Sequence, residues 1–147
     1  MRWGVGGAIA QKFAQEGFFT VVTTRSEKNA APLAAAIREQ GGDAMIVELD
    51  LVSQDSIAAA FATIRREAGD PEVLVYNAGS DVLATDPLAS LRLTPGEMAE
   101  RDLYVVTAVR EQGIPLALVL SGGYGPKSWE AHARSLEGIL VRFDKQV

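Results

Sequence analysis

The chain has 147 residues, a formal net charge of −5 and no cysteine. This length suits one domain that buries roughly two-thirds of its unfolded surface. The lack of cysteine excludes disulfides and cysteine-ligated zinc, and an acidic chain without a Lys/Arg cluster does not suit nucleic-acid binding. No apolar run approaches the roughly 18 residues of a membrane span, and Gln11 and Lys12 interrupt the first apolar stretch, so we expect a soluble, cytoplasmic protein without membrane partners.

Glycines and capping residues divide the first half of the chain into alternating helices and strands. One helix opens directly on Gly4-Val5-Gly6-Gly7, and Gly17 can supply its left-handed C-terminal cap. A second helix tolerates Pro32 only in its first turn, and Ser53 can cap a third. The predicted elements are helices over about 8–16, 29–40 and 54–68 and strands over 18–24 and 44–49.

The second half continues the same alternation. Four apolar residues at 73–76 predict a buried parallel strand, which ends in a loop that begins Asn-Ala-Gly. Thr94, Pro95 and Glu97 form a capping box with proline at the first helical position, and Ser128 can cap the last helix. The predicted elements are a strand over 73–76, a loop over 80–93, a helix over 95–112, a strand over 116–120, a glycine loop over 121–126 and a helix from 128 onward.

Two of these helices carry apolar stripes that we expect to face the core. Such spacing marks a core face more often than a surface for a partner. The stripes are Ile57, Phe61 and Ile64 in the helix over 54–68, and Trp129, Ala133, Leu136, Leu140 and Phe143 in the last helix.

Strands that alternate with helices predict a single three-layer α/β domain over 1–147 with a mostly parallel sheet of four strands. Such sheets place their ligands at the carboxyl ends of the strands. The strand over 73–76 and its Asn-Ala-Gly loop are therefore the first place to look for a site.

The first half of the chain resembles the short-chain dehydrogenase/reductase family, which implies a Rossmann-like fold. The resemblance rests on Gly4-Val5-Gly6, Gly7-Ala8-Ile9-Ala10, Arg25, Asp50-Leu51 and Asn77-Ala78-Gly79. It implies that Gly4 and Gly6 let the backbone approach a cofactor pyrophosphate at a helix N-terminus. It also implies that Arg25 meets an adenosine 2′-phosphate and favours NADP over NAD, that Asp50 receives the adenine amino group, and that Asn77, Ala78 and Gly79 line the cofactor cleft.

Two departures from that family's pattern weaken the expected activity. Only Met1-Arg2-Trp3 precede the glycines, so we expect the family's central first strand and its first glycine to be missing. The family's proton donor is a tyrosine with a lysine four residues on, yet none of Tyr76, Tyr104 and Tyr124 has that lysine. We therefore expect no hydride-transfer site and only weak binding of NADP.

Residues 73–147 resemble the end of a class IV-type histone deacetylase or of a related acetylpolyamine amidohydrolase. The carrying residues are Tyr76-Asn77-Ala78-Gly79-Ser80-Asp81, Asp86-Pro87-Leu88, Leu91, Arg101-Asp102, Gly113-Ile114-Pro115 and Ser121-Gly122-Gly123-Tyr124. The resemblance implies that Asp86 matches a zinc-ligating aspartate. It also implies that Tyr124 matches the tyrosine that stabilises the tetrahedral intermediate through its hydroxyl.

The deacetylase chemistry is also incomplete. A catalytic zinc needs three protein ligands, but the family's Asp-x-His and His-His elements have no counterpart, and His132 is the only histidine. We expect no bound zinc and no catalytic residue, with Asp86 and Tyr124 as remnants. The alternative interpretations are a turn residue before proline for Asp86, a loop-packing aromatic for Tyr124 and an ordinary helix position for His132.

Both resemblances include the Tyr-Asn-Ala-Gly strand end, so a junction at 73–79 explains them together. We interpret the chain as a chimera, constructed or naturally rearranged, with a dehydrogenase-like segment over 1–79 and a deacetylase-like segment over 73–147. The strand over 116–120 could fill the place of the missing first strand. This would give the order 3-2-1-4, in dehydrogenase numbering, in a circularly permuted Rossmann-like sheet.

Three functions remain open. The first is a folded chimera without enzymatic activity. The second is a residual module that binds NADP, NAD or phosphate, for which Gly122, Gly123 and Gly125 offer a further anion loop before a helix. The third is a reductase or zinc deacetylase fragment completed by an oligomer partner, for instance in a homodimer.

Overall fold

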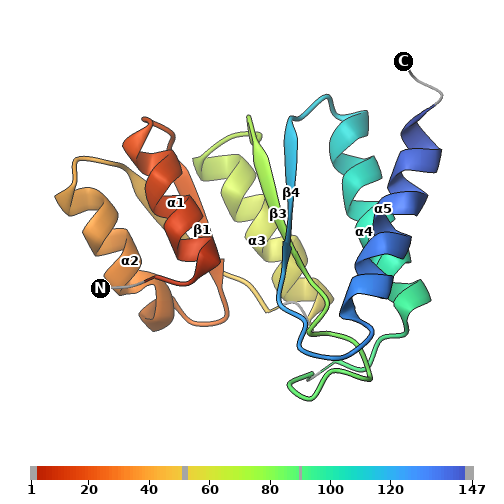
Figure 1. Cartoon of the computed structure of the whole chain (residues 1–147). Coiled ribbons are helices and arrows are strands. Elements are labelled where there is room, and N and C mark those ends of the chain that lie inside the picture. Colours follow the sequence, from red (N-terminus) through yellow and green to blue (C-terminus); the bar gives the residue numbers. More distant parts are fainter. Residues whose placement is uncertain (1–2, 51–52, 90, 145–147) are drawn as a thin grey trace. The chain divides into compact units, whose positions relative to one another are not determined.

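The computed structural model describes residues 3–50, 53–89 and 91–144, which form five helices and four strands (Figure 1). In chain order the elements are α1 (Val5–Gln15), β1 (Thr20–Thr24), α2 (Glu27–Glu39), β2 (Ala44–Glu48), α3 (Gln54–Glu67), β3 (Leu74–Gly79), α4 (Pro95–Glu111), β4 (Leu116–Ser121) and α5 (Ser128–Phe143). The paired strands are parallel. The predicted α/β class and the alternation of helices and strands are confirmed.

Most predicted helix ends are confirmed. The Ser53 hydroxyl caps α3 by accepting a hydrogen bond from the Ser56 amide at 3.2 Å, the Thr94–Glu97 capping box opens α4, and Gly17 has a left-handed φ of +89°. Two details differ from the prediction. Pro32 lies inside α2 because this helix begins at Glu27. Ser128 is the first residue of α5, and its hydroxyl donates to the Gly125 carbonyl instead of capping the helix.

The chain divides into two compact units, Met1–Pro71 (unit 1) and Glu72–Val147 (unit 2). Each unit holds its own two-stranded sheet, β1 with β2 in unit 1 and β3 with β4 in unit 2. The boundary between the units lies next to the junction that the sequence predicted at 73–79.

Within the described part of the chain each hydrogen-bonded ladder lies inside one unit, β1 with β2 and β3 with β4. The predicted pairing of the strand over 116–120 with the strand over 73–76 is confirmed. Its pairing with β1, and with it the order 3-2-1-4, would cross the boundary between the units and stays a prediction. Helix α2 joins β1 to β2 and α4 joins β3 to β4, and strands joined by one such crossover pair readily.

In unit 1, helices α1 and α2 lie side by side and cover one face of the sheet (Figure 1). Their shared core consists of Ala14, Leu33, Ala34, Ile37 and Ala44, with Trp3, Ala10, Val22 and Ile46 packed against it. Val47 is buried as well, and strand alternation turns its side chain to the face opposite Ile46. Helix α3 packs on β2, so this sheet has helices on both faces.

In unit 2, helices α4 and α5 pack against each other (Figure 1). The core between them is small and consists of Leu83, Met98 and Ala131, with Val82 packed against it. The loop between β3 and α4 therefore contributes to this core as well as the helices. This placement fixes the loop that carries Asp81 and Asp86.

The predicted apolar stripe of α5 is largely exposed, and that of α3 is only partly buried. In α5, Trp129 is 69% exposed and Leu140 is 67% exposed, whereas Ala131 and Ser135 are buried. In α3, Ile57 and Ile64 are half-buried, but Phe61 is 60% exposed and Ala60 is the buried residue. Small side chains let a helix approach its neighbour closely, and here this close contact outweighs burial of the larger residues.

None of the helices in the described part of the chain has the length and apolar character that a membrane crossing requires.

Candidate functional site

The four predicted cofactor residues of unit 1, Gly4, Gly6, Arg25 and Asp50, lie at one edge of its sheet. Arg25 directly follows β1, and Asp50 follows β2 with one residue between them. The two strands are parallel and in register from Thr20 with Ala44 to Thr24 with Glu48, so they end at the same edge. Helix α1 begins at this edge, because it runs antiparallel to β1 and a short loop connects the two (Figure 1).

The N-terminus of α1 is open. Gly4 is its N-cap residue and makes no side-chain cap, and the first turn contains no acidic residue. A Cβ atom added at Gly4 or Gly6 would meet nothing within 4 Å. Free first-turn amides with a favourable helix dipole and no obstructing side chain suit a phosphate group. The surroundings of Gly4 and Gly6 therefore fit the pyrophosphate of a dinucleotide. A nicotinamide dinucleotide bound there would supply hydride-transfer chemistry.

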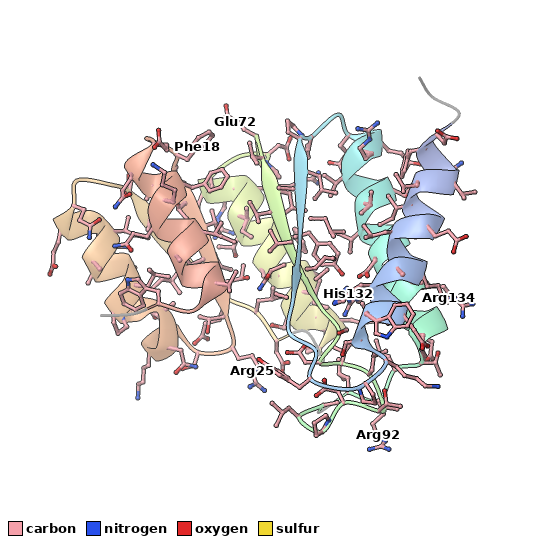
Figure 2. The ribbon with its side chains drawn as sticks, viewed as in Figure 1. Phe18, Arg25, Glu72, Arg92, His132 and Arg134 are labelled. Carbon is pink, nitrogen blue, oxygen red and sulfur yellow. The ribbon has the colours of Figure 1, made fainter. Side chains whose placement is uncertain are left out.

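Arg25 is exposed and projects from the turn after β1 (Figure 2). In the described residues no carboxylate pairs with its guanidinium, which is free to meet an anion. Asp50 is half-buried, and its backbone amide donates to the Ser56 hydroxyl at 2.9 Å. This bond fixes the backbone of the turn that leads into α3.

A further carboxylate lies at this edge, and sequence reasoning missed it. The Glu48 Oε1 atom accepts a hydrogen bond from the Glu27 amide at 3.1 Å, at the start of α2. Glu48 thus occupies the helix N-terminus next to Arg25. Only the strand register brings the two residues together, because they lie 21 positions apart in the sequence.

In unit 2, the predicted cleft residues Asn77, Ala78 and Gly79 form the end of β3. Asn77 is exposed and Ala78 is buried. A Cβ atom at Gly79 would lie 2.6 Å from Asp81 Oδ1 and 2.9 Å from the Ser121 carbonyl oxygen. The space that the missing side chain of Gly79 leaves is therefore occupied by atoms of the chain's own loops.

Asp86 connects two loops of unit 2. Its Oδ2 atom accepts hydrogen bonds from the amides of Tyr124 (2.6 Å) and Gly125 (3.1 Å), and its Oδ1 atom accepts one from the Leu88 amide (2.8 Å). These bonds, above all the one from Tyr124, lower the pKa of Asp86. Burial raises that pKa and opposes them in part. The carboxylate is an internal anion that fills the amide cradle of the glycine loop.

The glycines of this loop are needed for packing. Gly122 and Gly123 have φ values of +59° and +106°. A Cβ atom at Gly122 would lie 2.6 Å from Asp81 Oδ2, and one at Gly123 would lie 2.0 Å from Ser80 Oγ. A Cβ atom at Gly125 would lie 2.9 Å from the Thr85 carbonyl oxygen. The loop is thus closed by residues 80–86, which favours the interpretation of a turn without a ligand.

Zinc does not fit the predicted remnant site. Both oxygens of Asp86 already accept amide hydrogen bonds. Across 3–50, 53–89 and 91–144, no three His, Asp or Glu side chains gather so that they could hold a metal ion. Tyr124 is 67% exposed. The His132 Nδ1 atom (residue labelled in Figure 2) is buried without a hydrogen-bond partner in the described residues.

A buried polar network behind β3 also escaped the sequence reasoning. Asp102 is 1% exposed, and its Oδ1 atom accepts hydrogen bonds from the Tyr76 hydroxyl (2.6 Å) and from Arg101 Nε (2.9 Å) and Nη2 (2.7 Å). Arg101 Nη2 also donates to the Gly79 carbonyl at 3.4 Å. Burial, followed by the hydrogen bond to Asp102, raises the pKa of Tyr76. The network ties the end of β3 to α4.

In unit 1, parallel strands are joined by a helix, and helix α1 begins on uncapped glycines at the carboxyl ends of those strands. This arrangement defines a Rossmann-like α/β protein. Residues 2–99 match the family described as short chain dehydrogenase. The chain therefore belongs to the short-chain dehydrogenase family, as the sequence predicted for its first half.

Individual relatives match shorter parts of the chain. A 3beta-hydroxysteroid dehydrogenase of Mediterraneibacter gnavus is 37% identical over 76 residues, which are 52% of this chain and 28% of that protein. Histone deacetylase 2 of Arabidopsis thaliana is 42% identical over 69 residues, which are 47% of this chain and 18% of that protein. The chain thus spans less than a third of either relative, and the deacetylase resemblance is a short partial match.

Solved structures share the fold at low sequence identity. A hydroxysteroid dehydrogenase of Escherichia coli gives a TM-score of 0.66 at 18% identity, covering 97% of this chain and 64% of that one. A metagenomic short-chain oxidoreductase in complex with NADP gives 0.59 at 19% identity, covering 93% and 86%. These likenesses confirm the Rossmann-like class.

Proposed function

We propose that the chain is a short-chain dehydrogenase relative without hydride transfer of its own, whose remaining activity is weak binding of an adenine dinucleotide by unit 1. The observation that carries this proposal is the open N-terminus of α1 at Gly4 and Gly6, at the sheet edge where Arg25 and Asp50 follow their strands. Gly4 and Gly6 would hold the pyrophosphate, Arg25 a 2′-phosphate and Asp50 the adenine amino group. A structural neighbour in complex with NADP supports this choice of ligand.

The tyrosines support the lack of hydride transfer. None of the three is followed by a lysine four residues on. Tyr76 already donates its hydroxyl proton to buried Asp102, and its raised pKa makes it a poorer acid than an ordinary tyrosine. A proton donor needs a pKa closer to the working pH.

The origin of the chain as a chimera is a second part of the proposal. A dehydrogenase-like segment over 1–79 and a deacetylase-like segment over 73–147 would meet next to the boundary between the two units. The partial identity with histone deacetylase 2 supports the second segment. The family match extends to residue 99, beyond the proposed junction at 73–79. Such an overlap is expected if both parent proteins contain a strand like the one over 73–76 and a similar loop after it.

Calorimetric titration of the full chain with NADP, NAD and ADP tests the binding proposal. We expect dissociation constants in the range of about 0.1–1 mM, which correspond to roughly 4–5.5 kcal/mol of binding free energy. The Arg25→Ala variant should lose affinity for NADP and keep its affinity for ADP, because only NADP carries the 2′-phosphate. Binding weaker than millimolar for all three ligands would contradict the proposal.

Enzyme assays test the third hypothesis of a fragment completed by an oligomer partner. We expect neither NADPH oxidation nor acetyl-lysine hydrolysis above background, and no stoichiometric zinc in the purified protein. A reaction rate per chain that rises with protein concentration would show that a homodimer completes an active site, and it would overturn the proposal.

A further inference from the structure

Two buried polar atoms of helix α5 have no hydrogen-bond partner in the described residues. They are the Oγ atom of Ser135 and the Nδ1 atom of His132. Ser135 is only 2% exposed. The two residues lie one turn apart on α5, so their side chains share a side of the helix. Buried polar groups are nearly always bonded to protein or to ordered water, so this pair indicates a ligand.

Two contacts fix the register of α5 against α4. Near the starts of the helices, Met98 of α4 and Ala131 of α5 belong to one buried cluster. Near their ends, the Arg110 guanidinium lies over the Phe143 ring, 5.4 Å from the ring centroid. Start therefore meets start and end meets end, so the two helices run parallel.

This register places Asp102 of α4 level with Ser135 of α5. Each of them lies one helical turn after its helix's member of the first contact pair, and each is buried. Figure 2 shows His132 on the side of α5 that faces the strands of unit 2, and Arg134 on the opposite side. The unpartnered atoms of α5 therefore lie on the side of the buried carboxylate.

The Asp102 carboxylate can accept a further hydrogen bond. The Tyr76 hydroxyl and two nitrogens of Arg101 all donate to its Oδ1 atom. Among the residues that the structure describes, none donates to Oδ2. The Ser135 hydroxyl is level with this carboxylate but does not reach it within hydrogen-bond distance. A water molecule can bridge polar groups at such a separation.

We propose that one buried water molecule binds between α4 and α5, held by Ser135, His132 and Asp102. The water accepts a hydrogen bond from the Ser135 hydroxyl and donates one each to His132 Nδ1 and Asp102 Oδ2. A neutral imidazole with its proton on Nε2 leaves Nδ1 as the acceptor. About three hydrogen bonds are usual for a buried water.

The bound water would extend the polar network of Tyr76, Arg101 and Asp102 to a third element. That network already connects β3 with α4, and the water would add α5. Unit 2 would then be held together by polar contacts as well as by its small apolar core. This site lies in unit 2 and does not depend on the nucleotide site proposed for unit 1.

A high-resolution crystal structure of the full chain tests the position of the water. We expect one ordered water within about 3 Å of Ser135 Oγ, His132 Nδ1 and Asp102 Oδ2. A direct hydrogen bond between Ser135 and Asp102, or a contact between α4 and α5 without a water, would overturn the proposal.

The Ser135→Ala variant tests the hydrogen bond to the water in solution. Ala133→Ser, at an exposed position of the same helix, is the matched control, because it measures the intrinsic preference of α5 for alanine over serine. After correction for that preference, we expect Ser135→Ala to lower the folding equilibrium constant about fivefold. Urea denaturation measures both variants. A corrected constant that rises would show an unpaired hydroxyl and would overturn the proposal.

A double-mutant cycle tests whether Ser135 and His132 bind the same molecule. The two side chains are not bonded to each other, so coupling between them requires a shared partner. We expect the combined loss for His132→Phe with Ser135→Ala to be at least about threefold smaller than the product of the single losses. The cycle of His132→Phe with Ala133→Ser should show no coupling. Losses that multiply independently in the first cycle would overturn the proposal.

Discussion

Asp86 joins the loop after β3 to the loop after β4 through three backbone amides. Its ionised form is the one that accepts these bonds, so the fold favours the charged carboxylate. Protonation must therefore weaken the fold. The residue that sequence similarity matched to a zinc ligand acts here as a structural anion.

The first prediction is an acid-sensitive contribution of Asp86 to stability. Its pKa is lower in the folded than in the unfolded state, so the contribution is complete above about pH 5 and is lost as the pH falls below its unfolded pKa of about 3.9 and through its lower folded pKa. Thermal melts of Asp86→Asn and wild type between pH 7 and pH 2 should differ most at neutral pH and converge in acid. Asp43→Asn, at an exposed position, is the control. A constant difference at all pH values would contradict this assignment.

Asp102 carries the second prediction. Asp102→Ala leaves the Tyr76 hydroxyl and the Arg101 guanidinium without their acceptor, and loss of one partner of a buried ion pair costs about 3 kcal/mol of unfolding free energy. Tyr76→Phe removes one hydrogen bond while Arg101 still pairs with Asp102, so it should cost about 1 kcal/mol. Urea denaturation measures both. Equal losses would show that the pair with Arg101 contributes nothing.

At the residue scale, the sequence predicted side chains but not their partners. The family resemblances point to Arg25, Asp50 and Asp86 as site residues. The contacts of Glu48 with Glu27 and of Tyr76 with Asp102 depend on strand register and helix packing. Those are fixed by tertiary structure, and no local pattern records them.

At the scale of elements, the glycine loop after β4 is built for close contact with residues 80–86. Gly122 and Gly123 combine left-handed φ angles with neighbours that leave no room for a Cβ atom. Gly113 has a left-handed φ of +70° but open surroundings, and Gly138 lies in α5 with open surroundings. Alanine substitutions at Gly113, Gly123 and Gly138 therefore distinguish the cost of a left-handed φ angle from the cost of a steric clash.

The third prediction uses that series. Gly113→Ala should cost about 1 kcal/mol through φ alone. Gly123→Ala should cost clearly more, because its Cβ would also displace Ser80. Gly138→Ala should raise stability by about 0.5–1 kcal/mol, since alanine favours a helix interior over glycine. Chemical denaturation gives the order, and a Gly123→Ala variant no less stable than Gly113→Ala would contradict the packing described.

The helices show which sequence signals were sufficient. Capping residues predicted the ends of α3 and α4 because a cap is a local hydrogen bond. The apolar stripe of α5 failed because periodicity reports which face is apolar, not which face meets a neighbour. Ala131 and Ser135 meet α4 closely, and Trp129 stays at the surface.

At the scale of the whole molecule, the chain holds two compact units with separate cores. The α/β class followed from the alternation of elements. The pairing of strands did not follow from local patterns, because it requires contacts between segments far apart in the chain. Inside each unit, the crossover helix pairs the two strands that it connects.

The fourth prediction is that each core controls its own unfolding. Leu33→Ala in unit 1 and Met98→Ala in unit 2 each remove a buried side chain, at a cost of about 2–5 kcal/mol. Hydrogen exchange should show increased opening within the mutated unit and little change in the other. Equal increases throughout the chain would show that the two units unfold as one.

The central claim is that unit 1 retains the nucleotide-binding edge of a short-chain dehydrogenase. An NMR titration of the ¹⁵N-labelled full chain with NADP tests it most directly, because it reports both affinity and location. We predict saturable shifts at the amides of Gly6, Arg25 and Asp50 at submillimolar to millimolar NADP, with the Arg25 shift reduced when NAD replaces NADP. An unchanged spectrum at saturating concentrations, or shifts confined to other parts of the chain, would contradict the claim.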